Sequence, residues 1–162
     1  MKVLWAPWRM EYILGPKERE CVFCVRQAED KDRDNLILYR GPKSFVIMNK
    51  YPYNNGHLMV VPNVHTSSFD NLAEEDMLDI MKLTRFSIDC LTKAFHPEGF
   101  NVGVNLGEVA GAGIEEHLHV HIVPRWAGDA NFMTITGEIR VIPEHILDTY
   151  DKLSPFFAGG KK

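Results

Sequence analysis

Three of the seven histidines in the chain lie two residues apart, at His117, His119 and His121. The residues between them are apolar. Successive side chains of a β-strand point to opposite faces of the sheet, so the segment 117–123 is predicted to be a strand with all three imidazoles on one face. Such a face suits two kinds of chemistry. The imidazoles could bind a metal ion, or one neutral imidazole could act as a nucleophile while its neighbours hold an anionic substrate.

A glycine-rich segment comes directly before this predicted strand and reads Gly107-Glu108-Val109-Ala110-Gly111-Ala112-Gly113. Glycine has no Cβ, so the backbone N–H groups of such a loop can approach phosphate oxygens closely. The loop alone is a common feature. Its position beside the three histidines favours the nucleophile hypothesis, with a phosphate-bearing substrate.

A Cys-x-x-Cys pair, Cys21 and Cys24, is the second group of reactive side chains. Such a pair is used for redox exchange or for metal binding. A redox pair is expected in a thioredoxin-like βαβ context, which the sequence does not indicate. A zinc site needs two further ligands, and plain reduced thiols remain the alternative. The third cysteine, Cys90, lies in a helical pattern and is predicted to be a small apolar core residue.

Short apolar runs predict the strands that position these residues. The runs 36–39 and 45–48 are separated by Arg40-Gly41-Pro42-Lys43 and predict a hairpin. The turn-forming segment 51–56 precedes a buried strand over 57–61, and a further strand is predicted over 100–105. Pro124 is predicted to end the strand that carries the histidines.

A long helix is predicted between the strand over 57–61 and the strand over 100–105. One face of a 3.6-residue period contains Met77, Ile80, Met81, Thr84, Ile88, Leu91 and Phe95, and both methionines are expected in the core. Asn71 fits an N-cap with Glu74 in capping-box spacing, and Pro97 and Gly99 end the helix. A short helix is predicted from Pro143 to about Leu153. The order strands, helix, strands, helix predicts an α+β fold with an antiparallel sheet.

Length and composition are those of one globular domain over residues 1–162, with 45% hydrophobic and 25% charged residues. The net charge of −4 argues against a nucleic-acid partner. No apolar run approaches the roughly 18 residues of a membrane span, and the N-terminus lacks the apolar core of a secretory signal. Three cysteines fit a reducing compartment, so a cytoplasmic location is expected.

The segment His117–Val123 follows the pattern H-φ-H-φ-H-φ-φ, in which φ is apolar, and the chain resembles the histidine triad (HIT) superfamily. Further matches favour its bacterial branch, which contains diadenosine tetraphosphate phosphorylases: Trp5-Ala6-Pro7-Trp8-Arg9 with Tyr12, Asn49, Gly56-His57-Leu58, Asn105-Leu106-Gly107, Pro124-Arg125-Trp126, Gly128-Asp129 and Asn131-Phe132. The resemblance implies a five-stranded antiparallel sheet with one long and one short helix. It also implies a homodimer or a larger homo-oligomer.

The chemistry that the resemblance implies is nucleotidyl transfer in two steps. His119 attacks the α-phosphorus of a dinucleoside polyphosphate or nucleotide, and inorganic phosphate or water then attacks the nucleotidyl-histidine. Neutral imidazole is a good nucleophile near pH 7, and its phosphoramidate leaves well once protonated. The resemblance places around the nucleotide His121, the loop amides near Gly111 and Gly113, Asn49 near the ribose, and His57 and Asn105 in the pocket lining.

A structural zinc ion is also implied by the resemblance. In related galactose-1-phosphate uridylyltransferases, and in HIT proteins with this cysteine pair, zinc sits on two cysteines, a histidine after the matching strand and the first histidine of the triad. The matching residues are Cys21, Cys24, His65 and His117. Four protein ligands leave no open coordination position, so the metal would be structural.

One departure from the family pattern bears on the reaction. Many members carry Gln-Ser or Gln-Thr where this chain has Gly113 and Ile114. The absence of those polar side chains favours phosphorolysis of diadenosine tetraphosphate to ATP and ADP. A hydrolase that uses water is the first alternative, and a non-enzymatic nucleotide-binding regulatory protein is the second.

Overall fold

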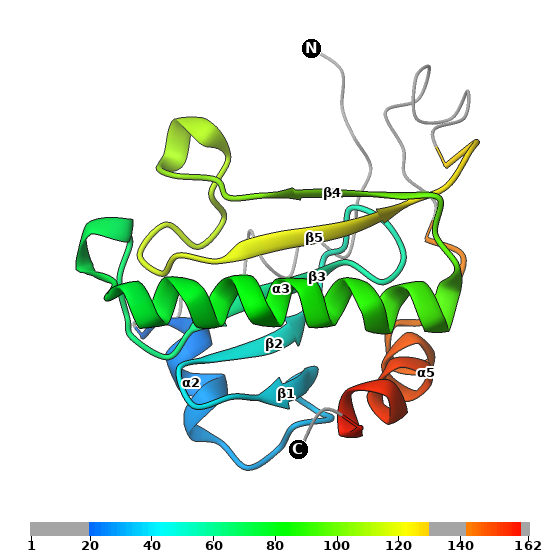
Figure 1. Ribbon diagram of the computed structural model, residues 1–162, viewed down its shortest axis with the longest axis horizontal. Coiled ribbons are helices and arrows are strands. Elements are labelled where there is room, and N and C mark those ends of the chain that lie inside the picture. The colour runs from blue at the N-terminus through cyan, green and yellow to red at the C-terminus, as the bar shows by residue number, and fades with distance from the viewer. Residues whose placement is uncertain (1–19, 130–141, 160–162) are drawn as a thin grey trace.

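Five strands form one antiparallel sheet in the order β1-β2-β3-β5-β4. The computed structural model describes residues 20–129 and 142–159 (Figure 1). The strands are β1 (Ile37–Arg40), β2 (Ser44–Met48), β3 (Leu58–Pro62), β4 (Gly99–Gly103) and β5 (Val120–Arg125). The helices described are α2 (Val22–Ala28), α3 (Glu74–Phe95) and α5 (Ile146–Ala158), with 3₁₀ turns at Phe69–Asn71 and Glu108–Ala110. The predicted α+β class, the five-stranded sheet and the hairpin are confirmed.

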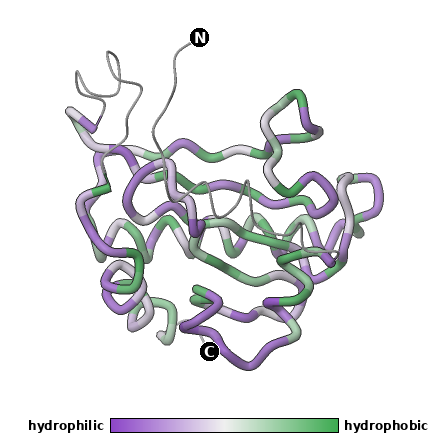
Figure 2. The backbone as a smooth tube through the Cα atoms, turned by 180° about the vertical axis from the view of Figure 1, so that it is seen from behind, coloured by the Kyte–Doolittle hydropathy of each residue, from purple (hydrophilic) through white to green (hydrophobic). Residues whose placement is uncertain are grey.

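The two faces of the sheet carry different elements. Tyr39 in β1 packs against Phe86 of α3 and is in register with Val46 of β2, so Val46 also faces α3. The neighbouring Phe45 therefore faces the other way, and it packs against Phe23 of α2. Helix α3 thus covers one face and α2 lies on the opposite face. Figure 2 shows apolar segments concentrated in the central strands, while the connection from α2 to β1 is hydrophilic.

The buried face of α3 differs from the one predicted. Ile80, Thr84 and Leu91 are buried as expected, but Met77 and Met81 are 37% and 62% exposed. The sheet instead covers a stripe rotated toward Leu83, Ser87 and Cys90. The apolar surface of the helix is wider than the strip that the sheet contacts, so periodicity identifies the helix and leaves its exact rotation undetermined.

The starts of the two predicted helices, α3 and α5, also differ from prediction. Helix α3 is capped at Ala73, whose N–H donates to Asp76, while Asn71 lies in the preceding 3₁₀ turn and donates to the Thr66 hydroxyl. Helix α5 begins at Ile146, because the His145 ring accepts a hydrogen bond from the Leu147 N–H and acts as its N-cap. His145 therefore has a structural role that the sequence pattern did not indicate.

Strand β5 begins later and ends later than the alternating pattern predicted. His117 and His119 precede it, and the Leu118 N–H donates to the Thr66 carbonyl instead of to a strand. Pro124 lies inside β5, opposite Phe100 of β4. Proline is tolerated there because β3 pairs with β5 only as far as Ile122, which leaves one side of the strand without a partner strand.

No helix in the described ranges combines the length and the apolarity that a membrane span requires.

Candidate active site

The three predicted site histidines gather on the sheet face that α2 covers. His121 is in register with Met59, which pairs with Ile47 on the same face as Phe45. All three rings are buried, with exposed fractions of 0% for His117, 4% for His119 and 9% for His121. The prediction of one shared location is confirmed, although only His121 lies in regular strand structure.

His119 has the tautomer that a nucleophile requires. Its Nδ1 lies 2.8 Å from the backbone carbonyl oxygen of His117. A carbonyl only accepts hydrogen bonds, so the proton of the neutral ring sits on Nδ1 and Nε2 keeps a lone pair. Burial lowers the pKa of His119 below its ordinary value, so the ring is neutral near pH 7.

His121 has the opposite tautomer, which two neighbours determine. The Tyr53 N–H donates to Nδ1 of His57 at 3.0 Å, so the His57 proton is on Nε2. That Nε2–H donates to Nδ1 of His121 at 2.9 Å, which places the His121 proton on its own Nε2. The Asn105 side-chain nitrogen lies 3.5 Å from this Nε2, and since both groups donate, this contact is not a hydrogen bond in the assigned tautomer. Burial, and then the neighbouring His119, lower the pKa of His121 to about 4, so it is a neutral N–H donor.

Asn49 and His57 meet at one end of the sheet. The Asn49 N–H donates to the His57 carbonyl, and both residues line a pocket beside the start of α5. Gly56 makes this turn possible. Its φ of 73° is left-handed, and a Cβ there would lie 3.2 Å from the Leu91 side chain. Asn49 and His57 thus lie beside one another at one pocket, and their contact with a nucleotide stays a prediction.

The glycine-rich loop forms a short 3₁₀ turn over Glu108–Ala110. Gly111 ends it with a left-handed φ of 86°, which explains the glycine there. The Gly111 N–H donates to the Glu108 carbonyl at 2.9 Å and is therefore engaged within the loop. Contact of the Gly111 and Gly113 amides with phosphate stays a prediction.

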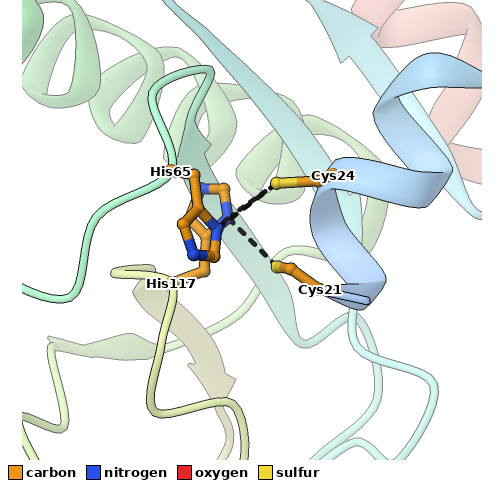
Figure 3. Close-up of side chains that lie close together, drawn as sticks. All are labelled: Cys21, Cys24, His65 and His117. Carbon is orange, nitrogen blue, oxygen red and sulfur yellow. Dashed lines mark hydrogen bonds between the residues drawn. The ribbon is translucent and has the colours of Figure 1, made fainter. Parts of the chain in front are cut away.

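A second cluster joins four side chains that could hold a metal (Figure 3). Cys21 precedes α2, Cys24 lies in its first turn, His65 follows β3, and His117 precedes β5. Their ligand atoms all lie within 4.8 Å of one another. The His117 Nε2–H donates to the Pro62 carbonyl at 2.9 Å, so the lone pair of Nδ1 points at the cysteines.

The separations within this cluster fit tetrahedral zinc. Metal–sulfur bonds of about 2.3 Å and metal–nitrogen bonds of about 2.0–2.1 Å give tetrahedron edges of about 3.5 Å for S–N and about 3.3 Å for N–N. The Sγ–Nδ1 separations are 3.3 Å for Cys21 and His117, 3.4 Å for Cys24 and His65, and 3.6 Å for Cys24 and His117. The two Nδ1 atoms of His65 and His117 are 3.3 Å apart. The four predicted ligands therefore converge with the geometry of a Cys₂His₂ site.

Sequence reasoning missed helix α2 and two aromatic residues at the site. The seven residues of α2 have no side-chain cap, so neither length nor capping indicates a helix. Phe23 of α2 packs against His117 and His119, and Tyr53 lies against His57 and His121. The only signal available for Phe23 is its place between the two cysteines.

The buried triad and its antiparallel sheet can now be compared with known proteins. The family model for the HIT domain matches residues 30–128, so the chain belongs to the histidine triad family.

Individual relatives refine this membership. The AP-4-A phosphorylase of Mycobacterium tuberculosis is 42% identical over 90% of this chain and 79% of its own length. Adenosine 5'-monophosphoramidase hnt1 of Schizosaccharomyces pombe is 30% identical over 65% of this chain and 74% of its own.

A solved structure of a zinc-bound histidine triad protein from Mycobacterium smegmatis has a TM-score of 0.69 and 22% identity, covering 86% of this chain and 94% of that one. At this identity the similarity shows the shared fold.

Proposed function

We propose that this protein is an enzyme that splits diadenosine tetraphosphate with inorganic phosphate into ATP and ADP. The observation that carries the proposal is the hydrogen bond from the His119 Nδ1–H to the His117 carbonyl. It leaves Nε2 free to attack phosphorus. The similarity to an AP-4-A phosphorylase supports the substrate, because 42% identity extends over 90% of the chain.

In the first step Nε2 of His119 attacks the α-phosphorus of one adenylate. The N–P bond forms, the bond from phosphorus to the bridging oxygen breaks, and ATP leaves. The ring then carries a positive charge, and its Nδ1–H remains on the His117 carbonyl, which stabilises that charge. In the second step an oxygen of inorganic phosphate attacks the same phosphorus, the N–P bond breaks, and ADP leaves with His119 neutral again.

The neighbouring groups hold the phosphates and the nucleoside. The His121 Nε2–H, beside Asn105, donates to a phosphoryl oxygen on which negative charge grows during attack. The family resemblance assigns further phosphate contacts to the glycine-rich loop near Gly111 and Gly113, and the Gly111 N–H would leave the Glu108 carbonyl to donate there. Asn49 lies near the ribose and His57 fixes the ring of His121.

Zinc held by Cys21, Cys24, His65 and His117 has a structural role in this proposal. A four-ligand set leaves no coordination position for substrate. The metal would connect the start of α2 to the segments after β3 and before β5, since the four ligands come from these three places.

We also propose a homodimer in the cytoplasm. β4 is the outer strand of the described sheet, next to β5 on one side only, and Val102 in it is 47% exposed. An open strand edge with apolar side chains is a template for a second copy. None of the three cysteines forms a disulfide, which suits a reducing compartment.

Product analysis tests the reaction. The purified protein is incubated with diadenosine tetraphosphate, with and without inorganic phosphate, and His119→Ala serves as the control. ATP and ADP formed only with phosphate support the proposal. ATP and AMP formed without phosphate would replace it with a hydrolase, and binding without turnover would replace it with a nucleotide-binding protein.

A further inference from the structure

Phe23 contacts two of the three triad histidines. Its ring centroid lies 5.5 Å from that of His117 at an interplanar angle of 83°, and 5.2 Å from that of His119 at 58°. Both distances lie in the range that aromatic pairs prefer. The Phe23 side chain is 1% exposed, so its ring is enclosed by protein on all sides.

One hydrogen bond and two ring contacts are described around the buried imidazole of His119. Its Nδ1–H has one acceptor, the His117 carbonyl, and the rings described beside it are those of Phe23 and His121. His121 has a role toward the phosphates, so it must respond to substrate. Phe23 has no polar atom in its side chain and takes no part in the chemistry. Its contact with the imidazole therefore need not change during the reaction.

Phe23 is itself held from two sides. It lies between Cys21 and Cys24 in the chain, so a metal ion bound by the cluster would fix the turn of α2 that carries it. Behind it the ring of Phe45 packs edge-on at 6.4 Å. A phenyl ring has only two side-chain torsions, so this enclosure leaves it rigid.

We propose that Phe23 is a positioning residue for His119, which keeps the imidazole in the orientation that places Nδ1–H on the His117 carbonyl and Nε2 toward the substrate. The proposal rests on the assignment of His119 as the nucleophile. It gives the Cys-Val-Phe-Cys turn a role in catalysis in addition to metal binding.

Phe45 offers a matched control for substitution. It is buried to the same extent as Phe23, 1% exposed, and belongs to the same layer of side chains. No ring contact between Phe45 and the triad histidines is found among the described residues. Phe23→Leu and Phe45→Leu remove similar atoms from the same layer, but only Phe23→Leu removes a contact with His119.

The test measures the tautomer of His119 by ¹⁵N NMR of the imidazole nitrogens in the zinc-containing protein. In the wild type, one nitrogen is protonated and the other is not, so their shifts are well separated. In Phe23→Leu the two shifts should move toward each other, because the ring samples other orientations. In Phe45→Leu they should stay at the wild-type values. Phe23→Met, which keeps most of the side-chain volume, serves if Phe23→Leu does not fold.

Kinetics give a second readout. A small misplacement of a reacting group costs up to about 10²-fold in rate. Phe23→Leu should therefore lower kcat by about tenfold to a hundredfold at nearly unchanged KM, whereas Phe45→Leu should keep kcat. His119 shifts in Phe23→Leu that match the wild type, or an equal displacement in Phe45→Leu, would overturn the proposal. The NMR measurement does not require turnover, so it tests the positioning role of Phe23 even if the proposed reaction is not observed.

Discussion

The three triad histidines are the same residue type with different proton positions. His117 carries its proton on Nε2 because it faces the Pro62 carbonyl, and His119 carries it on Nδ1 because it faces the His117 carbonyl. His121 carries its proton on Nε2 because His57 donates to its other nitrogen. The sequence predicted that these residues share a site, and their individual roles stay a prediction from the family resemblance. It could not predict the tautomers, because each depends on an acceptor brought near by folding.

The nucleophile prediction is tested by His119→Ala. We expect turnover to fall on the order of 10⁴-fold or more, since the N–P bond cannot form. Zinc content, fold and nucleotide binding should stay at wild-type levels, because the metal ligands and the pocket lining are unchanged. A quench above neutral pH during wild-type turnover should trap a base-stable, acid-labile label on His119. Near-wild-type turnover in the variant would exclude the covalent mechanism.

His121→Ala should slow turnover without abolishing it. Removing one donor to a developing oxyanion typically costs about 10²–10³ in rate, and loop amides remain. His57→Ala is the companion variant. It leaves His121 in place but removes the group that fixes its proton on Nε2, so a smaller loss is expected. Steady-state kinetics of both variants measure whether His121→Ala loses more rate than His57→Ala. Unchanged rates in His121→Ala would exclude His121 from the phosphate site.

The lowered pKa of His121 predicts how stability depends on pH. Its pKa is about 4 in the folded chain, against about 6.5 in an unfolded one. Between these values the unfolded chain binds more protons, so the free energy of unfolding falls as pH decreases from about 6.5 to about 4, by up to about 1.4 kcal/mol per pH unit. Urea titrations at several pH values measure the slope. His121→Asn, which does not titrate there, should show a shallower slope than the wild type.

Regular elements were predicted where the pattern was long or its turn residues distinctive. Helix α3 and the β1–β2 hairpin fit this description and were predicted correctly, although the N-cap of α3 was not. Helix α2 has seven residues without a side-chain cap, and contacts from the rest of the fold hold it in place. The alternation around His119 did not define a strand, because the segment is buried on both faces and Leu118 pairs with Thr66.

Metal analysis tests how α2 is held. Protein purified without added metal should contain about one zinc ion per chain, as one four-ligand site requires. Cys24→Ser should lower zinc content and melting temperature together, because metal binding and folding of this segment are coupled. Cys90→Ala is the matched control, since Cys90 is a buried thiol outside the cluster. It should lower the melting temperature through lost packing and keep the zinc. Full zinc occupancy in Cys24→Ser would remove Cys24 from the ligand set.

At the scale of the molecule, the site is assembled from segments far apart in the chain. Cys21 and His117 are separated by 96 positions, and His57 and His121 by 64, yet each pair is in contact. Sequence spacing alone does not reveal such pairs. They follow from the sheet order, in which β5 lies between β3 and β4 and brings the triad beside residues that flank β3. The triad and the metal cluster thus lie on the face that carries α2, while α3 covers the other.

Among the described residues the sheet order also leaves β4 at an edge, which makes the oligomeric state a property of the whole fold. Sedimentation at micromolar concentration should give twice the mass of one chain, because strand edges with apolar side chains associate. Val102→Glu places a charge on this edge and should shift the protein toward the monomer. Phe156→Glu is the control. Phe156 is 38% exposed on α5, which contacts β1 at the opposite side of the sheet, so the same charge there should leave the mass unchanged. A wild-type monomer, or equal dissociation in both variants, would place the interface elsewhere or exclude it.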